Sequence, residues 1–337
     1  MTDGAGEVRD GDHLDEPVLE RHLRGVLELA DAPMQVRQFA GGRANLTYLI
    51  TFGDQELVLR RPPRGTLAPG AHDMAREHRV LSLLSPVYPR APRALHLCED
   101  PDVVGAPFVV LERRNGVVVR DAIASSMAHQ PDVTRRVDLA LLDAAADLHR
   151  IDVHANGLDA LGRTEGFGQR QVDGWLARWQ QAARGDTTSR MDDLGHRLRD
   201  LLPPQLRLSV VHNDLKLDNC QFQPRDPDTV TSVFDWDMGT IGDPLFDIGS
   251  LLVAMRAAPN VWVLSVDDAV ERYVDRSGID VTHIDWYLAF GTWRTAVVLQ
   301  QLYNRYLDGH TTDQRYASYG ASIHDYVDRT TLLLESR

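Results

Sequence analysis

Lysine is almost absent from this chain of 337 residues. Lys216 is the single lysine, so all but one of the 36 basic side chains counted as lysine or arginine are arginines. No glycine is followed by lysine, which excludes the Gly-Lys pair of a P-loop phosphate-binding motif. The scarcity also makes arginine less surprising at a position where lysine is usual, since both side chains carry the charge with different geometry.

Cysteine is nearly as rare. Cys98 and Cys220 are the only two cysteines, too few for a disulfide framework or a cysteine-rich zinc site. Both lie in strand-like apolar runs, where buried free thiols are common. We therefore expect both thiols to be chemically inert.

The chain also lacks long apolar runs and an excess of positive charge. No apolar stretch approaches the roughly 20 residues that span a bilayer, and the first dozen residues lack the features of a signal peptide. With 49 acidic against 36 basic residues, the net charge of -13 would repel phosphate backbones and anionic lipids. We expect a cytoplasmic protein whose partner is a small molecule, with no nucleic acid and no membrane; the sequence carries no signal for an oligomeric state.

The first third of the chain alternates short strand-like runs with turn signals. Residues 1–13 are polar and acidic and predict a disordered tail, and apolar residues then recur at helical spacing from Leu14 to Leu27. A second helical pattern covers about residues 71–84. Strand candidates cover residues 34–39, 47–50, 57–60, 94–97 and 108–111. This pattern predicts an antiparallel sheet.

The pattern becomes mainly helical from about Asp132 to the C-terminus. Together the two parts predict an α+β fold with a small, antiparallel, β-rich N-terminal lobe at 14–115 and a larger, mainly helical C-terminal lobe at 116–337. The polar stretch from Glu112 to Gly116 is the expected hinge. No Gly-x-Gly-x-x-Gly follows a strand, which disfavours a Rossmann dehydrogenase.

An apolar strand delivers polar side chains into a loop at residues 210–219, which read Val-Val-His-Asn-Asp-Leu-Lys-Leu-Asp-Asn. Phosphoryl transfer to a hydroxyl needs a carboxylate that accepts the hydroxyl proton and cations that hold the phosphate. Asp214 can be that carboxylate, and Lys216 can meet the γ-phosphate. Asn219 offers an amide oxygen, a ligand type that suits Mg²⁺.

A second short apolar strand ends in two carboxylates, in the order Val-Phe-Asp-Trp-Asp from residue 233. Asp235 would bridge Mg²⁺ to the phosphates, and Asp237 is either a further metal ligand or an exposed carboxylate beside the site. Taken singly, an aspartate in a loop is more often a turn or cap residue, and His212 alone would be a structural histidine. The combined spacing favours phosphoryl transfer.

These segments resemble the aminoglycoside phosphotransferase and choline kinase superfamily, whose members share a bilobal protein-kinase-like fold. The resemblance covers about residues 15–310. It rests on Gly41-Gly42-x-x-Asn45, Val58-Leu59-Arg60, Arg76-Glu77-His78, His212-Asn213-Asp214, Asp235-Trp236-Asp237 and the Gly-Asp-Pro-Leu-Phe-Asp run at 242–247. Residues 59–63, 171–175 and 286–294 are most similar to the kinase domain fused to some acyl-CoA dehydrogenases.

The resemblance implies ATP and Mg²⁺ as cofactors and gives roles to further residues. Gly41, Gly42 and Asn45 resemble the nucleotide-positioning loop, although Gly-Gly between strands is by itself more often a hairpin turn. Arg60 stands where the family usually holds the α- and β-phosphates with lysine, and Glu77 is its expected partner. The alternative for this pair is a surface ion pair.

The remaining assignments follow from the same resemblance. Glu112, Arg113 and Arg114 resemble the linker between the lobes, whose backbone would meet adenine. Asp247 is expected to brace the catalytic loop through hydrogen bonds without touching substrate. Arg294 is either an anion contact or part of a buried structural salt bridge.

The predicted activity is transfer of the γ-phosphate of Mg-ATP to a hydroxyl of a small molecule. A metabolic alcohol or a hydroxyacyl-CoA is favoured over an aminoglycoside as the acceptor. The alternative is a pseudokinase-like nucleotide-binding or interaction module without turnover, which the arginine at position 60 suggests. The retained Asp214, Lys216, Asn219 and Asp235 argue against that alternative.

Overall fold

The structure is a computed structural model that describes residues 4–39, 45–63, 73–258, 260–311 and 313–335. Two compact units are present. The first comprises Met1–Ala140, Asn156–Leu161 and Leu217–Gly239, and the second comprises Leu141–Ala155, Gly162–Lys216 and Thr240–Arg337. The predicted lobes are continuous in sequence, whereas these units interleave. The difference arises because residues 217–239 pair and pack with the first part of the chain, as when Val117 pairs with Phe222.

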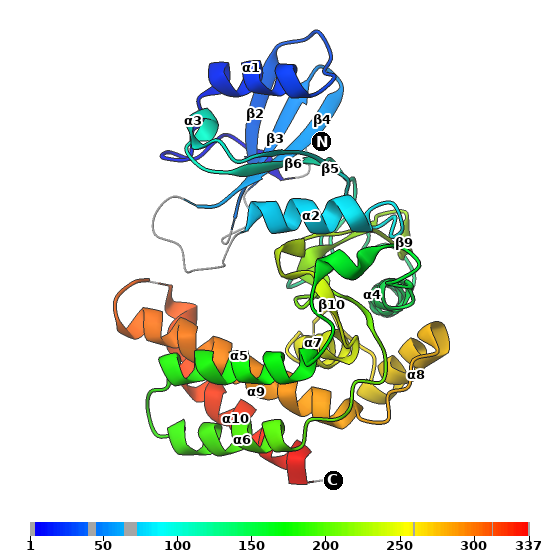
Figure 1. Ribbon diagram of the computed structural model, residues 1–337, viewed down its shortest axis with the longest axis vertical. Helices are drawn as coiled ribbons and strands as arrows, with labels where there is room; N and C mark the ends of the chain where they lie inside the picture. The colour runs from blue at the N-terminus through cyan, green and yellow to red at the C-terminus, as the bar shows by residue number, and fades with distance from the viewer. Residues whose placement is uncertain (1–3, 40–44, 64–72, 259, 312, 336–337) are drawn as a thin grey trace. The chain divides into compact units, whose positions relative to one another are not determined.

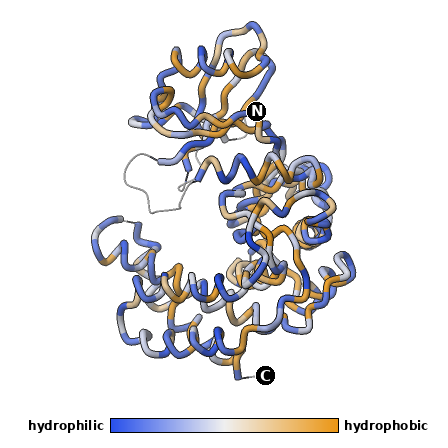
Figure 2. Tube along the Cα trace, viewed as in Figure 1, coloured by the Kyte–Doolittle hydropathy of each residue, from blue (hydrophilic) through white to orange (hydrophobic). Residues whose placement is uncertain are grey.

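The first unit is built on an antiparallel sheet in the order β1-β2-β3-β4-β6-β5 (Figure 1). The predicted strands are confirmed, and the one expected at 34–39 has the bounds that the sequence indicated. Figure 2 shows apolar residues concentrated along these strands. The strands are β1 (Ala5–Gly6), β2 (Met34–Phe39), β3 (Leu46–Phe52), β4 (Gln55–Arg61), β5 (Ala94–Cys98) and β6 (Phe108–Glu112).

Two helices cover the two faces of this sheet (Figure 1). Helix α1 (Glu16–Val26) begins at Asp15, whose carboxylate accepts the N–H of Val18, and its Leu19 and Leu23 are fully buried. Helix α2 (Met74–Leu84) covers the other face and contacts β5 and β6. The side of the sheet that faces α1 forms a continuous apolar core with Tyr48, Ile50, Phe52, Leu57, Leu59, Phe108 and Val110.

The expected disordered tail has defined partners from residue 4 onward. Strand β1 pairs with β2, where Ala5 lies opposite Phe39 and is buried. The Tyr48 hydroxyl donates to the carbonyl of Asp12 at 2.7 Å. These contacts order the segment, because a polar composition does not prevent two residues from extending an existing sheet edge.

The rest of the first unit includes a second, small hairpin. Strands β8 (Cys220–Gln223) and β9 (Asp226–Val233) pair antiparallel. The short helix η2 (Leu217–Asn219) precedes this hairpin, and η3 (Trp236–Met238) follows it. The unit also contains α3 (Pro101–Val104) and η1 (Leu158–Leu161).

The second unit is mainly helical, and its only sheet within the described residues is the pair β7 (Ser209–Val211) and β10 (Thr240–Gly242). Helix α4 (Val133–His149) enters it after Ala140. The other helices are α5 (Phe167–Ala182), α6 (Thr188–Asp200), α7 (Leu245–Arg256), α8 (Val266–Ser277), α9 (Ile284–Leu307), η4 (Gln314–Ser318) and α10 (Tyr319–Glu335). Within the described part of the chain, none of the helices has both the length and the apolar character needed to cross a membrane.

Helices α7 and α9 approach each other closely where both carry glycine. A Cβ atom added at Gly249 would lie 2.5 Å from the carbonyl oxygen of Tyr287, and one at Gly291 would meet the backbone of Gly249 at 3.1 Å. Beside this crossing, Trp286 and Phe290 stack with ring centroids 5.4 Å apart. The close approach fixes α7, the helix whose first turn carries Asp247.

Candidate active site

The first unit brings three of the predicted site residues into direct contact. Arg60 projects from β4, and its guanidinium donates to the carboxylates of Glu77 on α2 and of Asp235 just after β9, the second at 2.6 Å. Glu77 is fully buried and Arg60 nearly so. The planar fork of arginine allows two carboxylates to be held at once. The Arg60–Glu77 pair is therefore buried. It is not the surface ion pair that the sequence left open as an alternative.

The charges of this cluster depend on one another. Burial by itself would lower the pKa of Arg60, but Glu77 and Asp235 outweigh it and raise that pKa above its ordinary value. Burial raises the pKa of Glu77, while Arg60 and the backbone N–H of Trp236 act in the opposite direction. Removing the arginine charge would leave a buried carboxylate without compensation.

The hairpin of β8 and β9 brings two predicted metal ligands to one end. Cys220 pairs with Val233, and the next bond outward joins the N–H of Phe234 to the carbonyl of Asn219 at 2.8 Å. Asp235 follows at once, in the left-handed backbone region with φ of 68°, which aspartate adopts more readily than most residues. Its side chain is about one-third exposed, at 31%.

The donor set at this end of the hairpin suits a hard cation. Asn219, Asp235 and Asp237 offer amide and carboxylate oxygens, the ligands that Mg²⁺ prefers. Asp237 lies in η3, close enough to act electrostatically on both Arg60 and Glu77. The residues present therefore fit a magnesium ion, and their roles as ligands stay a prediction.

The predicted nucleotide-positioning residues are placed only in part. Gly41 and Gly42 lie outside the described residues, and Asn45 is buried immediately before β3. In the linker, Glu112 ends β6 and pairs with Arg93 at 3.3 Å.

The arginines of the linker are also held by the protein itself. Arg113 lies over the ring of Phe39, with 5.4 Å between the guanidinium carbon and the ring centroid. Arg114 donates to the carbonyls of Pro89 and Ala91 at 2.7 and 3.1 Å. The contact of the linker backbone with a base stays a prediction.

The second unit carries the predicted catalytic loop directly after β7. Lys216 donates to the carboxylate of Asp214 at 2.7 Å, and both side chains are about one-third exposed, at 38% and 33%. The backbone N–H of Asp214 donates to Nδ1 of His212 at 3.2 Å, so His212 has a local structural role. Asn213 between them adopts φ of 66°, and asparagine is one of the few residue types that tolerate this region.

Asp247 holds this loop through hydrogen bonds to its backbone, which are the contacts that the resemblance predicted. Its two carboxylate oxygens accept the backbone N–H groups of His212 and Asn213 at 2.6 and 2.7 Å. Nε2 of His149 lies 3.2 Å from the same carboxylate, and Nδ1 of His149 lies 2.8 Å from the Tyr273 hydroxyl. Because an ionised carboxylate only accepts, His149 donates through Nε2 and its Nδ1 accepts from tyrosine.

Arg294 contacts the same loop in a way that neither sequence-based alternative described. From α9 it donates to the carbonyl of Asn213 at 2.8 Å and to the Ser250 hydroxyl at 3.1 Å. Its guanidinium also lies 4.8 Å from the ring centroid of Trp175. These contacts tie the loop to α9 through a carbonyl, a hydroxyl and an aromatic ring, with no carboxylate among them.

His149 is a positioning residue that sequence reasoning missed. It ends helix α4, far from the loop motif in the chain, and nothing in its local pattern marks it. A fully buried histidine that bridges Asp247 and Tyr273 becomes visible only once the fold is known. By contrast, the left-handed backbone at Asn213 could have been expected from the sequence, because asparagine is common in such turns.

The sheet of the first unit, the Arg60–Glu77 pair from strand and helix, and the aspartate-bearing loop after β7 together define a protein-kinase-like α+β fold. Residues 35–283 match the model of the phosphotransferase enzyme family, and the chain belongs to this family. The resemblance seen in the sequence, including the likeness to the branch linked to acyl-CoA dehydrogenases, is confirmed.

Among curated proteins, Acyl-CoA dehydrogenase family member 10 from Mus musculus is 31% identical over 321 residues, which covers 90% of this chain and 30% of that protein. The chain spans 30% to 44% of the length of the first three curated relatives it matches.

Two solved structures show how far the fold is shared. The crystal structure of a candidate aminoglycoside phosphotransferase from Ralstonia eutropha JMP134 superposes with a TM-score of 0.81 at 26% identity, covering 96% of this chain and 99% of that one. An aminoglycoside phosphotransferase in a ternary complex with AMP-PNP and hygromycin B gives a TM-score of 0.61 at 15% identity, covering 94% and 98%. The second likeness shows the fold alone.

Proposed function

We propose that this protein is a small-molecule kinase that transfers the γ-phosphoryl group of Mg-ATP to a hydroxyl group. The observation that carries the proposal is the contact of Arg60 with both Glu77 and Asp235. This cluster joins Arg60, which is expected at the nucleotide phosphates, to its helix partner Glu77 and to Asp235, which is expected at the metal. Membership in the phosphotransferase enzyme family supports it.

The catalytic loop supplies the groups that act on the acceptor. Asp214 would orient the hydroxyl and accept its proton as the hydroxyl oxygen bonds to phosphorus. Lys216, whose ammonium now contacts Asp214, would place a positive charge near the transferred phosphoryl group. Asp214 and Asn219 are five residues apart in the chain, so one short loop carries both the base and a metal ligand.

The first unit supplies the groups that hold the nucleotide and its metal. Arg60 would contact the α- and β-phosphates, and the backbone of the linker at Glu112–Arg114 would meet the base. Asn219, Asp235 and Asp237 would hold Mg²⁺, which neutralises the charge of the phosphate oxygens when bound. Catalysis by such a site consists mainly of positioning and electrostatic stabilisation.

The acceptor that we favour is a hydroxyl on an acyl-CoA thioester. The chain matches about 30% to 44% of the length of relatives that are named as acyl-CoA dehydrogenase family members. Their names suggest an acyl-CoA as the substrate class. The aminoglycoside-binding neighbour is 15% identical and shares the fold, which gives weaker support to an antibiotic acceptor.

The test is ADP release from Mg-ATP across a panel of acceptors. The panel contains hydroxyacyl-CoA esters with the hydroxyl at different positions, their non-hydroxylated acyl-CoA counterparts, choline-like alcohols, sugars and aminoglycosides. We expect turnover with hydroxyacyl-CoA esters and none with the counterparts, with a phosphoester seen by ³¹P NMR. Turnover with another class would keep the kinase and replace the acceptor. Nucleotide binding without turnover on any acceptor would favour the pseudokinase-like module.

The arginine at position 60 leads to a specific kinetic prediction. In Arg60→Lys, one ammonium replaces a fork that now reaches Glu77 and Asp235 together, so at least one of these contacts is lost. A hydrogen bond to a charged group contributes about 1.5–3 kcal/mol, which corresponds to a fall of about 10- to 100-fold in kcat/KM for ATP. Steady-state kinetics with varied Mg-ATP measure it. The matched control is Arg79→Lys, an exposed arginine on α2; an Arg60→Lys enzyme as active as this control would show that the fork is dispensable.

A further inference from the structure

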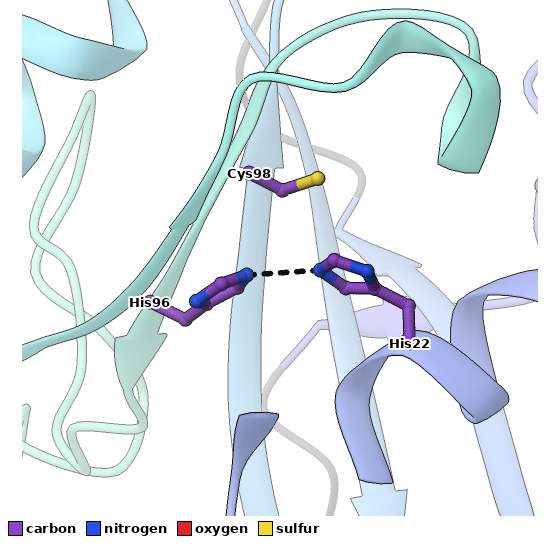
Figure 3. Close-up of side chains that lie close together, drawn as sticks. All are labelled: His22, His96 and Cys98. Atoms are coloured by element: carbon purple, nitrogen blue, oxygen red, sulfur yellow. Dashed lines mark hydrogen bonds between the residues drawn. The ribbon is translucent and has the colours of Figure 1, made fainter. Parts of the chain in front are cut away.

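Three side chains with good metal-binding atoms converge in the first unit, and none of them has a role in the site described above. His22 comes from α1, and His96 and Cys98 come from β5 (Figure 3). One ligand atom from each lies within 4.8 Å of the other two. The imidazoles of His22 and His96 point at each other, with Nε2 to Nε2 at 2.9 Å.

The fold explains why these three residues meet. His96 and Cys98 are two residues apart on a strand, so their side chains project from the same face of the sheet. That face is the one covered by α1. His22 lies three residues after Leu19 and next to Leu23, the two helix residues that are buried against the sheet, and this places its imidazole at the edge of that buried stripe.

The surroundings hold the imidazoles in place. The fully buried ring of Phe108 packs in a T-shaped arrangement against both imidazoles, with ring centroids 5.8 Å from His22 and 6.3 Å from His96. Cys98 is buried, while the two histidines are half-buried. The group therefore has a fixed apolar side and a side open to the arrival of an ion.

Two imidazole nitrogens at hydrogen-bonding distance must share one proton, because one ring has to donate and the other accept. A ring that accepts is neutral, and the neutral imidazole is the form that binds metals. Burial, together with the neighbouring His22 and His78, lowers the pKa of His96, which favours its neutral form. Burial also raises the pKa of the Cys98 thiol, so its proton would have to be displaced by the arriving ion.

We propose that His22, His96 and Cys98 bind a zinc ion, with a water molecule as the fourth ligand. Two nitrogens and one sulfur form a set that suits zinc and not magnesium, which prefers oxygen. The site therefore does not compete with the oxygen ligands after β9 for the same ion. It departs from the expectation that Cys98 is chemically inert.

The distances allow this ion with small side-chain adjustments. Zinc binds imidazole nitrogen at about 2.0–2.1 Å and thiolate at about 2.3 Å. Around a tetrahedral ion these lengths separate the donor atoms by about 3.4–3.6 Å. The two nitrogens, now 2.9 Å apart, would open slightly as the ion comes between them and the shared proton moves to Nδ1 of the donating ring. The sulfur, within 4.8 Å, would move inward by roughly 1.2 Å at most. Bound in this way, zinc would fasten α1 to β5, the edge strand of the sheet.

Cobalt(II) is the probe, since it takes zinc sites and reports a thiolate ligand by a near-ultraviolet charge-transfer absorption. The full chain, without an affinity tag and after treatment with a chelator, is titrated with Co²⁺ alone and then with Zn²⁺. We expect the thiolate band to appear at one equivalent of Co²⁺ and to disappear as Zn²⁺ displaces it. The oxygen ligands Asn219, Asp235 and Asp237 cannot produce this band.

Variants assign the band to these three residues. Loss of an outer partner of a ligand weakens metal binding by about 10- to 100-fold, so loss of a ligand in His22→Gln or His96→Gln should weaken it by at least about 100-fold. Cys98→Ser should abolish the band. The controls are Cys220→Ala, which removes the other thiol, and His196→Gln, an exposed histidine on α6; both should bind as the unaltered chain does.

Two results would overturn the proposal. One is a folded, unaltered chain that gives no thiolate band with Co²⁺. The other is a band that survives in Cys98→Ser or keeps its affinity in His22→Gln. If Cys98→Ser fails to fold, by circular dichroism, the half-buried His22 on α1 still provides the decisive variant.

Discussion

Asp214→Asn is expected to lower kcat by about 10²- to 10⁴-fold, the range that a general base contributes, while leaving nucleotide binding unchanged. The substitution preserves shape and removes the ability to take the hydroxyl proton, and it also replaces the ion pair with Lys216 by a neutral contact. The loop that carries Asp214 is held through the backbone of its neighbours by Asp247 and Arg294, so it should keep its conformation. Single-turnover kinetics with the accepted substrate separate this loss from any change in binding.

Asp218→Asn is the matched control for this experiment. Asp218 lies in the same loop, is exposed, and has no assigned role, so its kcat should stay near that of the unaltered chain. A comparable loss in both variants would point to a general effect of charge in the loop. Full activity in Asp214→Asn would remove Asp214 from the mechanism.

The sequence predicted the sheet well because its strands have strong local signals. Apolar alternation and the Gly53-Asp54 turn locate β2, β3 and β4 to within two residues at each end. It did not single out α6, whose residues are mostly polar, or α7, which is buried nearly all round and so has little helical periodicity. Strand β10 has three residues and depends on its pairing with β7.

Only some contacts of the candidate site could be predicted: the resemblance implied that Arg60 pairs with Glu77 and that Asp247 bonds to the loop. The resemblance pointed to Arg60 and the motif to Asp235, 175 positions away, yet no local pattern says that one guanidinium would bridge Glu77 and Asp235. The same holds for Arg294, whose contact with the carbonyl of Asn213 crosses 81 positions. Such contacts are set by how elements pack, and a single sequence shows only the period of each element.

Asp247→Asn is expected to lower the free energy of unfolding by about 3–5 kcal/mol, the usual cost of breaking a buried charged network. Asp247 is 1% exposed and accepts two backbone N–H groups as well as His149. An amide would turn its NH₂ toward at least one of these donors and leave it unpaired. Urea denaturation measures the loss, and Asp193→Asn, at an exposed position on α6, should change stability by less than about 0.5 kcal/mol.

This contribution should also depend on pH in a defined direction. Burial by itself raises the pKa of Asp247, but the bonds from His149 and from the backbone of His212 outweigh it and hold the pKa below its ordinary value. A lowered folded-state pKa means that the stabilisation is fully present above the unfolded value of about 3.9 and is lost as the pH falls through the folded value. The difference in unfolding free energy between the unaltered chain and Asp247→Asn should therefore be constant from pH 8 to about 5 and shrink below about pH 4. A difference that instead grew on acidification would mean that the carboxylate is not the form that braces the catalytic loop.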